Sequence, residues 1–261
     1  MCELYSPSKR LMILFVAAML LCLGGCAPGA ALRPGMPPKA LEMVSPTRPA
    51  TDRVTGIAQI DLVTAQGHYP IRAVMIIQRP SYLRLEMLPV IGTPDFFLAA
   101  SPDEMNIFIP SQSEFYRGKP TAENLARFLP WSFTLQEMVM ILSSTYPPLD
   151  GTKVSYESCL DDALLRVDMK TPAGPSQTIW MAKNERMVKL IRYDPLGRET
   201  YRAFFDDYAP GSAFAEKIMI QWADNVTSVS VRYSDLKVER NGDLSIFKLP
   251  VPPGSKTIYL D

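Results

Sequence analysis

The residue types that most often carry catalysis are scarce in this sequence and form no known motif. The chain of 261 residues has one histidine, His68, so a multi-histidine metal site is excluded. It contains no G-x-S-x-G, Walker or G-x-G-x-x-G loop and no paired C-x-x-C. The pairs Asp161-Asp162 and Asp206-Asp207 lack the spacing of a calcium loop. No nucleophile–base or metal constellation can be assembled, so the sequence argues against an enzyme.

The cysteines indicate a different chemistry, because three of the four lie in the first 26 residues. Lys9 and Arg10 precede an apolar run of 13 residues, 11–23. On a helix such a run rises about 20 Å, which is short of the roughly 30 Å hydrocarbon core of a bilayer. A basic start and a short apolar middle predict a secretory signal peptide at 1–25. A membrane anchor that is never cleaved is the alternative.

The end of this segment, Leu23-Gly24-Gly25-Cys26, resembles the lipobox of bacterial lipoproteins. The resemblance implies that the peptide is cut before Cys26 and that Cys26 carries diacylglycerol and an N-acyl chain such as palmitate. No other cofactor is expected. Since Ala27 rather than Asp follows the cysteine, the lipoprotein sorting rule implies anchoring at the outer membrane, facing the periplasm. Cys159 would be the one remaining thiol, which excludes an intramolecular disulfide.

The mature chain divides by composition into a tether and a folded domain. Residues 26–52 contain six prolines, and such a composition favours an extended tether. Residues 53–261 are predicted to form a single domain. Lys plus Arg and Asp plus Glu both number 27, so no nucleic-acid partner is expected. A hydrophobic content of 47% is ordinary for a globular domain.

Alternation of apolar and polar residues predicts antiparallel β-structure through the domain, as in 165–170. Turn signals such as Asp150-Gly151 and Asn241-Gly242 separate the candidate strands. The fold class is therefore mainly β with some helix (α+β), a curved sheet or open half-barrel of roughly 11 strands. The candidate strands are 54–65, 69–79, 82–89, 95–101, 104–110, 114–117, 152–159, 165–170, 178–181, 186–193, 199–208, 217–222, 228–233 and 244–249.

One helical interruption is predicted at 121–145. Thr121 is placed to cap a first short helix, and Thr134 with Glu137 forms a capping box for a second. A stripe at helical spacing follows, and Pro147-Pro148 ends the helix. We expect this pair to cross the apolar face of the sheet as a lid over a cavity. The predicted lining consists of Trp131, Phe133, Leu135, Met138, Val139 and Leu142.

The strand start at 53–60, the segment 83–98 and the hairpin-then-helices order at 104–145 resemble the LolA/LolB family. That resemblance covers about 54–260 and implies an open half-barrel whose apolar cavity receives the acyl chains of lipoproteins. A lipid-anchored member corresponds to LolB, the outer-membrane receptor, which takes its cargo from a soluble periplasmic LolA-like carrier. LolB has a protruding loop with an apolar residue that inserts cargo into the membrane. Val90 and Ile91 stand at the matching position.

Two functions remain open at this stage. The first is a carrier or receptor that binds acyl chains or lipoprotein cargo and helps insert it into the outer membrane. The second is a structural or interaction lipoprotein that uses the same fold as a solid scaffold in the cell envelope. The carrier requires a cavity of roughly 300 Å³ or more lined by apolar groups, whereas the scaffold requires none. Val90-Ile91 is correspondingly either an exposed loop or one tucked under the sheet edge.

Overall fold

The structure, a computed structural model, describes residues 33–35, 52–129, 133–149, 153–240 and 242–260. Its strands are β1 (Arg33–Gly35), β2 (Asp52–Thr64), β3 (Gly67–Gln78), β4 (Tyr82–Leu88), β5 (Phe96–Ala100), β6 (Met105–Ile109), β7 (Glu114–Gly118), β8 (Ser155–Asp161), β9 (Leu164–Lys170), β10 (Ser176–Met181), β11 (Met187–Tyr193), β12 (Glu199–Tyr208), β13 (Ala215–Trp222), β14 (Ser228–Arg240) and β15 (Lys256–Tyr259). Its helices are α3 (Ala122–Ala126) and α4 (Leu135–Leu142), with 3₁₀ turns η2 (Pro110–Gln112) and η3 (Leu244–Phe247). The predicted signal peptide at 1–25, Cys26 and Trp131 lie outside the described residues.

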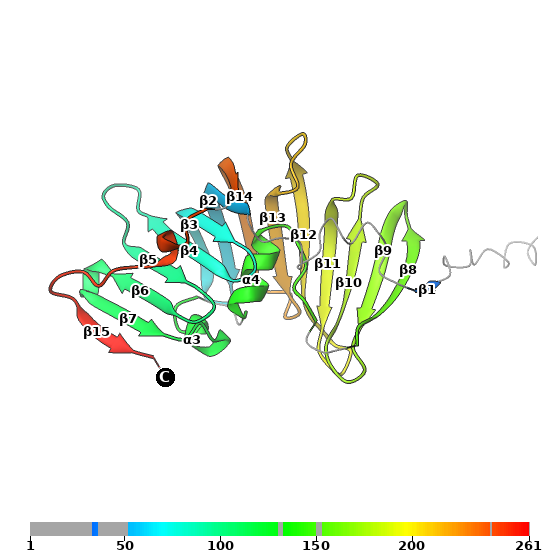
Figure 1. The fold of residues 1–261 in the computed structure, drawn as a ribbon, viewed down its shortest axis with the longest axis horizontal. Coiled ribbons are helices and arrows are strands. Elements are labelled where there is room, and N and C mark those ends of the chain that lie inside the picture. The colour runs from blue at the N-terminus through cyan, green and yellow to red at the C-terminus, as the bar shows by residue number, and fades with distance from the viewer. Residues whose placement is uncertain (1–32, 36–51, 130–132, 150–152, 241, 261) are drawn as a thin grey trace, which may run out of the picture. The chain divides into compact units, whose positions relative to one another are not determined.

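All the described strands belong to one open, curved sheet with the order β1-β8-β9-β10-β11-β12-β13-β14-β2-β3-β4-β5-β6-β7-β15 (Figure 1). Neighbours pair antiparallel except for β15, which runs parallel to β7. The predicted fold class, mainly β with a curved antiparallel sheet, is confirmed. No helix of the described part is long and apolar enough to cross a bilayer.

Three details of the sheet differ from the sequence prediction. The estimate of roughly 11 strands is too low, because the described residues form a 15-stranded sheet. Residues 33–35, expected in the tether, form β1 against β8, and β15 pairs with the distant β7. Both are short strands that depend on a partner far away in sequence. The predicted strand at 244–249 is wrong: the Asp243 carboxylate accepts a hydrogen bond from the Ser245 amide at 2.9 Å and starts η3 instead.

The apolar half of each alternating strand faces the concave side of the sheet. One row runs across β9 to β13 through residues paired in register, and all five are buried: Val167, Ile179, Leu190, Ala203 and Ile220. The opposite face carries basic and aromatic neighbours instead, with the Lys189 ammonium 4.5 Å from the ring centroid of Trp180. This alternation explains why the core lies on one side only.

Both predicted helix starts are present. The Thr121 side chain accepts a hydrogen bond from the Asn124 amide at 3.1 Å, which caps α3. At α4 the Thr134 hydroxyl accepts from the Glu137 amide at 3.1 Å, while the Glu137 carboxylate accepts from the Thr134 amide at 3.2 Å. These reciprocal bonds satisfy two amides that the helix itself leaves unpaired. Such a capping box is worth about 1 kcal/mol.

Helix α4 lies on the concave side and packs against β3 and β4 (Figure 1). It is buried on nearly all faces, with only Gln136 and Glu137 half-buried. Hydrogen bonds hold the end of α4 and the segment that follows it to three strands. The Tyr233 hydroxyl donates to the Leu142 carbonyl at 3.1 Å, and the Ala215 amide donates to the Ser144 hydroxyl at 2.7 Å. The Gln177 side-chain amide donates to the Pro147 carbonyl at 3.0 Å. Helix α4 is thus a fixed part of the core.

Candidate functional site

An apolar cavity lies between α4 and the strands β2–β4, β13 and β14. Phe133, Met138 and Leu142 contribute to it from the helical segment, as the sequence predicts. Its other lining residues are Ile60, Ile71, Met75, Leu83, Leu85, Met87, Leu129, Ile220, Trp222, Val229 and Val231. Leu135 and Val139 are buried but do not line this cavity, and Trp131 lies outside the described residues. The lining has no charged side chain.

The size of this cavity bears on the choice between carrier and scaffold. Its volume is about 40 Å³, whereas ligand pockets occupy roughly 300–1,000 Å³. An acyl chain therefore does not fit unless side chains move. Met75, Met87 and Met138 are suited to such movement, because the unbranched thioether side chain rearranges at low cost.

A large open groove adjoins the cavity at one end. It has a volume of about 690 Å³ and lies between the β2–β3 turn and the end of α3. Ile71, Met87 and Leu129 line both the groove and the cavity. Ile71 and Met87 are half-buried. These three side chains form the boundary between the solvent-exposed groove and the apolar interior.

A second groove adjoins the cavity on another side. Its volume is about 360 Å³, and it shares Phe133 and Trp222 with the cavity. The boundary is aromatic: the ring of Phe133 lies 5.1 Å from that of Trp222 and meets Tyr201 edge-to-face at 4.9 Å. The interior is therefore flanked by two open grooves, and each is separated from it by a few apolar side chains.

The second groove contains buried polar groups that the sequence analysis did not identify. Arg192 is 8% exposed, and its guanidinium donates to the Gln177 side-chain oxygen at 2.9 Å. Its other amino group is 3.9 Å from the Glu137 carboxylate. Burial, and then the charge of Glu137, raises the pKa of the Tyr201 phenol well above its usual value, so this hydroxyl stays protonated. No local motif marks these residues, because strand pairing brings them together.

Val90 and Ile91 lie in the connection between β4 and β5 and are exposed by 102% and 89%. Of the two alternatives left open by the sequence, the exposed loop is therefore the one present. Gly92 has a φ of 111°, in the region that favours glycine, and no atom lies within 4 Å of the position of a Cβ there. The loop leaves the sheet after Leu88, next to Met87, which lines both the cavity and the larger groove.

The remaining candidates for chemistry are scattered. Cys159 is half-buried and is the free cysteine of the described residues. His68 is exposed and lies 3.1 Å from the Asp61 carboxylate. Asp161 accepts a hydrogen bond from the Trp180 indole at 2.8 Å. Among the described residues, no three His, Cys, Asp or Glu side chains are close enough together to hold a metal ion.

The fold resembles solved structures. A candidate outer membrane lipoprotein-sorting protein domain from Vibrio parahaemolyticus is 16% identical, with a TM-score of 0.55 over 80% of this chain and 94% of that one. A LolA superfamily protein from Nitrosomonas europaea is 14% identical, with a TM-score of 0.52 over 80% and 96%. The chain has a LolA-like fold. A DUF1329 family protein from Desulfovibrio piger has the same fold at 13% identity, with a TM-score of 0.54 over 80% and 94%.

The LolA-like fold agrees with the resemblance drawn from the sequence at 53–60, 83–98 and 104–145. No protein-family model and no curated protein matches the chain. At 13–16% identity the likeness to these structures establishes the fold and not the activity. The activity has to be argued from the cavity, the grooves and the exposed loop.

Proposed function

We propose that this protein is an outer-membrane-anchored lipoprotein that binds acyl chains or lipoprotein cargo and helps insert it into the membrane. The observation that carries this proposal is that the 690 Å³ groove and the apolar cavity adjoin, with Ile71, Met87 and Leu129 lining both. A groove that ends on apolar side chains offers an acyl chain a path out of water. Burial of each methylene contributes about 0.8 kcal/mol, which favours such a transfer.

Occupation of the interior requires the cavity to widen. Helix α4 is bonded to the sheet through Leu142, Ser144 and Pro147, so the backbone of the helix is expected to stay in place. Rotation of Met87 and Met138 opens the boundary and the interior at lower cost. Acyl chains then replace the methionine contacts with contacts of the same apolar kind.

The anchor and the exposed loop complete this proposal. Diacylglycerol and an N-acyl chain on Cys26 hold the protein at the outer membrane, because two or more chains give stable binding. Val90 and Ile91 enter the lipid headgroup region and contribute about 1.5–3 kcal/mol each when buried. The partners are the outer membrane, lipoprotein acyl chains and a soluble LolA-like carrier in the periplasm. The protein has no catalytic role in this proposal.

Photolabelling of the full-length protein in isolated membranes tests acyl binding. A palmitate analogue with a diazirine on the chain is expected to label peptides of β3, β4 and α4. Ile71→Trp places a large ring at the boundary, where the half-buried position tolerates it, and should lower interior labelling about tenfold. Val63→Trp, on the exposed face of β2, is the matched control and should label normally. Equal labelling of both variants, or no interior labelling, refutes the carrier.

The alternative is a scaffold lipoprotein with a solid core, and the 40 Å³ volume of the cavity favours it. The absence of interior labelling is the result that this alternative requires. The anchor is tested separately: Cys26→Ala should leave an uncleaved precursor without radioactive palmitate. Equal incorporation of palmitate into the two proteins contradicts lipidation at Cys26.

A further inference from the structure

The second groove is built on a row of side chains that cross the sheet at one level. Strand pairing places Gln177, Arg192 and Tyr201 directly opposite one another on β10, β11 and β12, with Trp222 next on β13. They lie on the concave face, since they are two residues away from the buried row Ile179, Leu190, Ala203 and Ile220. Glu137 faces them from α4. The neighbouring row on this face, which includes Ile179 and Leu190, is entirely apolar. The polar residues Gln177, Arg192 and Tyr201 therefore need an explanation.

The hydrogen bonds of the row are incomplete. The Tyr201 side chain is 4% exposed, and its hydroxyl makes no hydrogen bond of ordinary distance and angle, although the Glu137 carboxylate lies close enough to raise its pKa. The Arg192 guanidinium has five N–H donors, of which one is given to Gln177. Its ion pair with Glu137 is long, at 3.9 Å, and the other oxygen of Glu137 accepts from Thr134. A buried donor without an acceptor is unfavourable, so the groove presents donors that a ligand can satisfy.

The charges around these donors cancel. Arg192 is positive, and Glu137 is negative. The remaining charged group of the groove, Asp194, is paired with Arg198 at 2.7 Å. A ligand with a free carboxylate or phosphate would add an unbalanced negative charge beside Glu137 in a partly dry site. An uncharged acceptor, such as an ester or amide carbonyl, accepts from Tyr201 and Arg192 without that penalty.

The donors Tyr201 and Arg192 lie next to the apolar cavity. The Tyr201 ring touches Phe133, and Phe133 and Trp222 line both this groove and the apolar cavity. A carbonyl bound at Tyr201 therefore lies beside the two packed aromatic rings that separate this groove from the apolar cavity, and an attached chain reaches the cavity when these rings move apart. This is the arrangement that an acyl chain attached through an ester or amide requires.

We propose that this groove binds the ester or amide linkage of an acylated molecule, with Tyr201 and Arg192 as donors to its carbonyl oxygen. The inference deepens the proposed function and rests on it. It also gives the bound molecule an orientation. The carbonyl end lies at β11 and β12, and the chain extends past Phe133 and Trp222 toward Met138.

Three photoreactive probes of equal chain length test this in membranes that contain the full-length protein: a methyl ester, a free acid and an unsubstituted alkane. The ester is expected to label the interior more strongly than the acid. Tyr201→Phe should lower ester labelling relative to alkane labelling about three- to tenfold, which is the loss of one hydrogen bond. The variant should melt at about the same temperature, because the hydroxyl it removes makes no hydrogen bond of ordinary geometry.

Tyr233→Phe is the matched control. Its hydroxyl is buried but bonded to the Leu142 carbonyl, so the variant should lose stability and keep the ester-to-alkane ratio. An unchanged ratio in Tyr201→Phe refutes the carbonyl site while acyl binding stands. Stronger labelling by the acid than by the ester also refutes it, in favour of an anion site. If none of the three probes labels the interior, the proposed function fails as well.

Discussion

Two connections of the sheet carry apolar residues and place them in opposite environments. The connection 89–95 exposes Val90 and Ile91, whereas the connection 119–154 contains the buried helix α4. The first joins β4 and β5, which are neighbours, so it turns back at the ends of these two strands. The second joins β7 and β8, which lie near opposite ends of the strand order, so it must cross the concave face. Figure 1 shows α4 on that path. The position of the flanking strands therefore decides burial.

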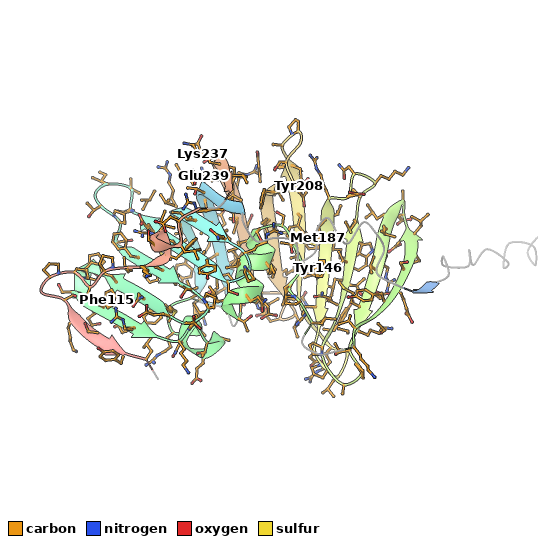
Figure 2. All side chains as sticks on the ribbon, viewed as in Figure 1. Phe115, Tyr146, Met187, Tyr208, Lys237 and Glu239 are labelled. Atoms are coloured by element: carbon orange, nitrogen blue, oxygen red, sulfur yellow. The ribbon has the colours of Figure 1, made fainter. Side chains whose placement is uncertain are left out.

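The crossing connection is also the better fixed of the two. After α4 the chain continues through buried residues, among them Tyr146, and Met187 on β11 is buried in the same core; both are labelled in Figure 2. Beside them, the Tyr208 hydroxyl donates to the Met187 carbonyl at 2.7 Å. By contrast, the backbone of the connection 89–95 is held at its end, where the Asp95 amide donates to the Met87 carbonyl at 3.3 Å. Substitutions in the two connections should therefore differ mainly in their effect on stability.

The largest effect is expected for Val139→Trp in α4. Val139 is 0% exposed and does not line the cavity, so the indole has no empty volume to enter. Overpacking of this kind should lower the free energy of unfolding by about 3 kcal/mol. Leu142→Phe is the control, because Leu142 lines the cavity and should tolerate the change at about 1 kcal/mol. Urea unfolding measures both, and equal losses would show that α4 is not packed more tightly at Val139.

A smaller effect on stability is expected for Ile91→Glu. The side chain is exposed, so the free energy of unfolding should change by less than about 0.5 kcal/mol. Transfer of an acyl probe to acceptor liposomes should nevertheless fall, since the carboxylate must be desolvated when the loop enters the membrane. Leu196→Glu, at the exposed turn after β11, is the control and should transfer normally. Equal transfer rates for Ile91→Glu and the unchanged protein contradict the insertion role.

The smallest effect is expected at a third connection, the turn between β13 and β14, which exposes Val226 but is held by its own hydrogen bonds. The Asp224 carboxylate accepts from the Thr227 hydroxyl at 2.6 Å and from its amide at 2.8 Å. The hydroxyl bond, followed by the two amide bonds, holds the pKa of Asp224 below its usual value. The stabilisation is therefore present above about pH 4 and is lost as pH falls through the lower folded pKa.

Asp224→Asn should accordingly be slightly less stable than the unchanged protein at pH 7, and the difference should disappear toward pH 2. Thermal unfolding across this range measures it. A difference that is constant with pH would show that the charge of Asp224 does not contribute to the turn.

Some parts of the site were accessible from the sequence. The capping box at Thr134 predicts where α4 begins, and helical spacing predicts that Met138 and Leu142 share a face. Gly92 and Pro94 predict the exposed turn after β4. The placement of Val139 was not accessible, since a stripe of apolar residues does not tell which member faces a cavity and which faces packed side chains.

The row of Gln177, Arg192 and Tyr201 illustrates the remaining limit. Each residue stands at an ordinary position of an alternating strand, and only the register of β10, β11 and β12 brings the three together. The same holds for β1 and β15, whose pairing is supplied by strands far away in sequence. Local propensity and periodicity act over a few residues and therefore determine strands, turns and helix starts. Contacts across the sheet depend on the burial of the whole apolar face, so the tertiary structure alone decides which polar groups meet and which apolar groups leave space between them.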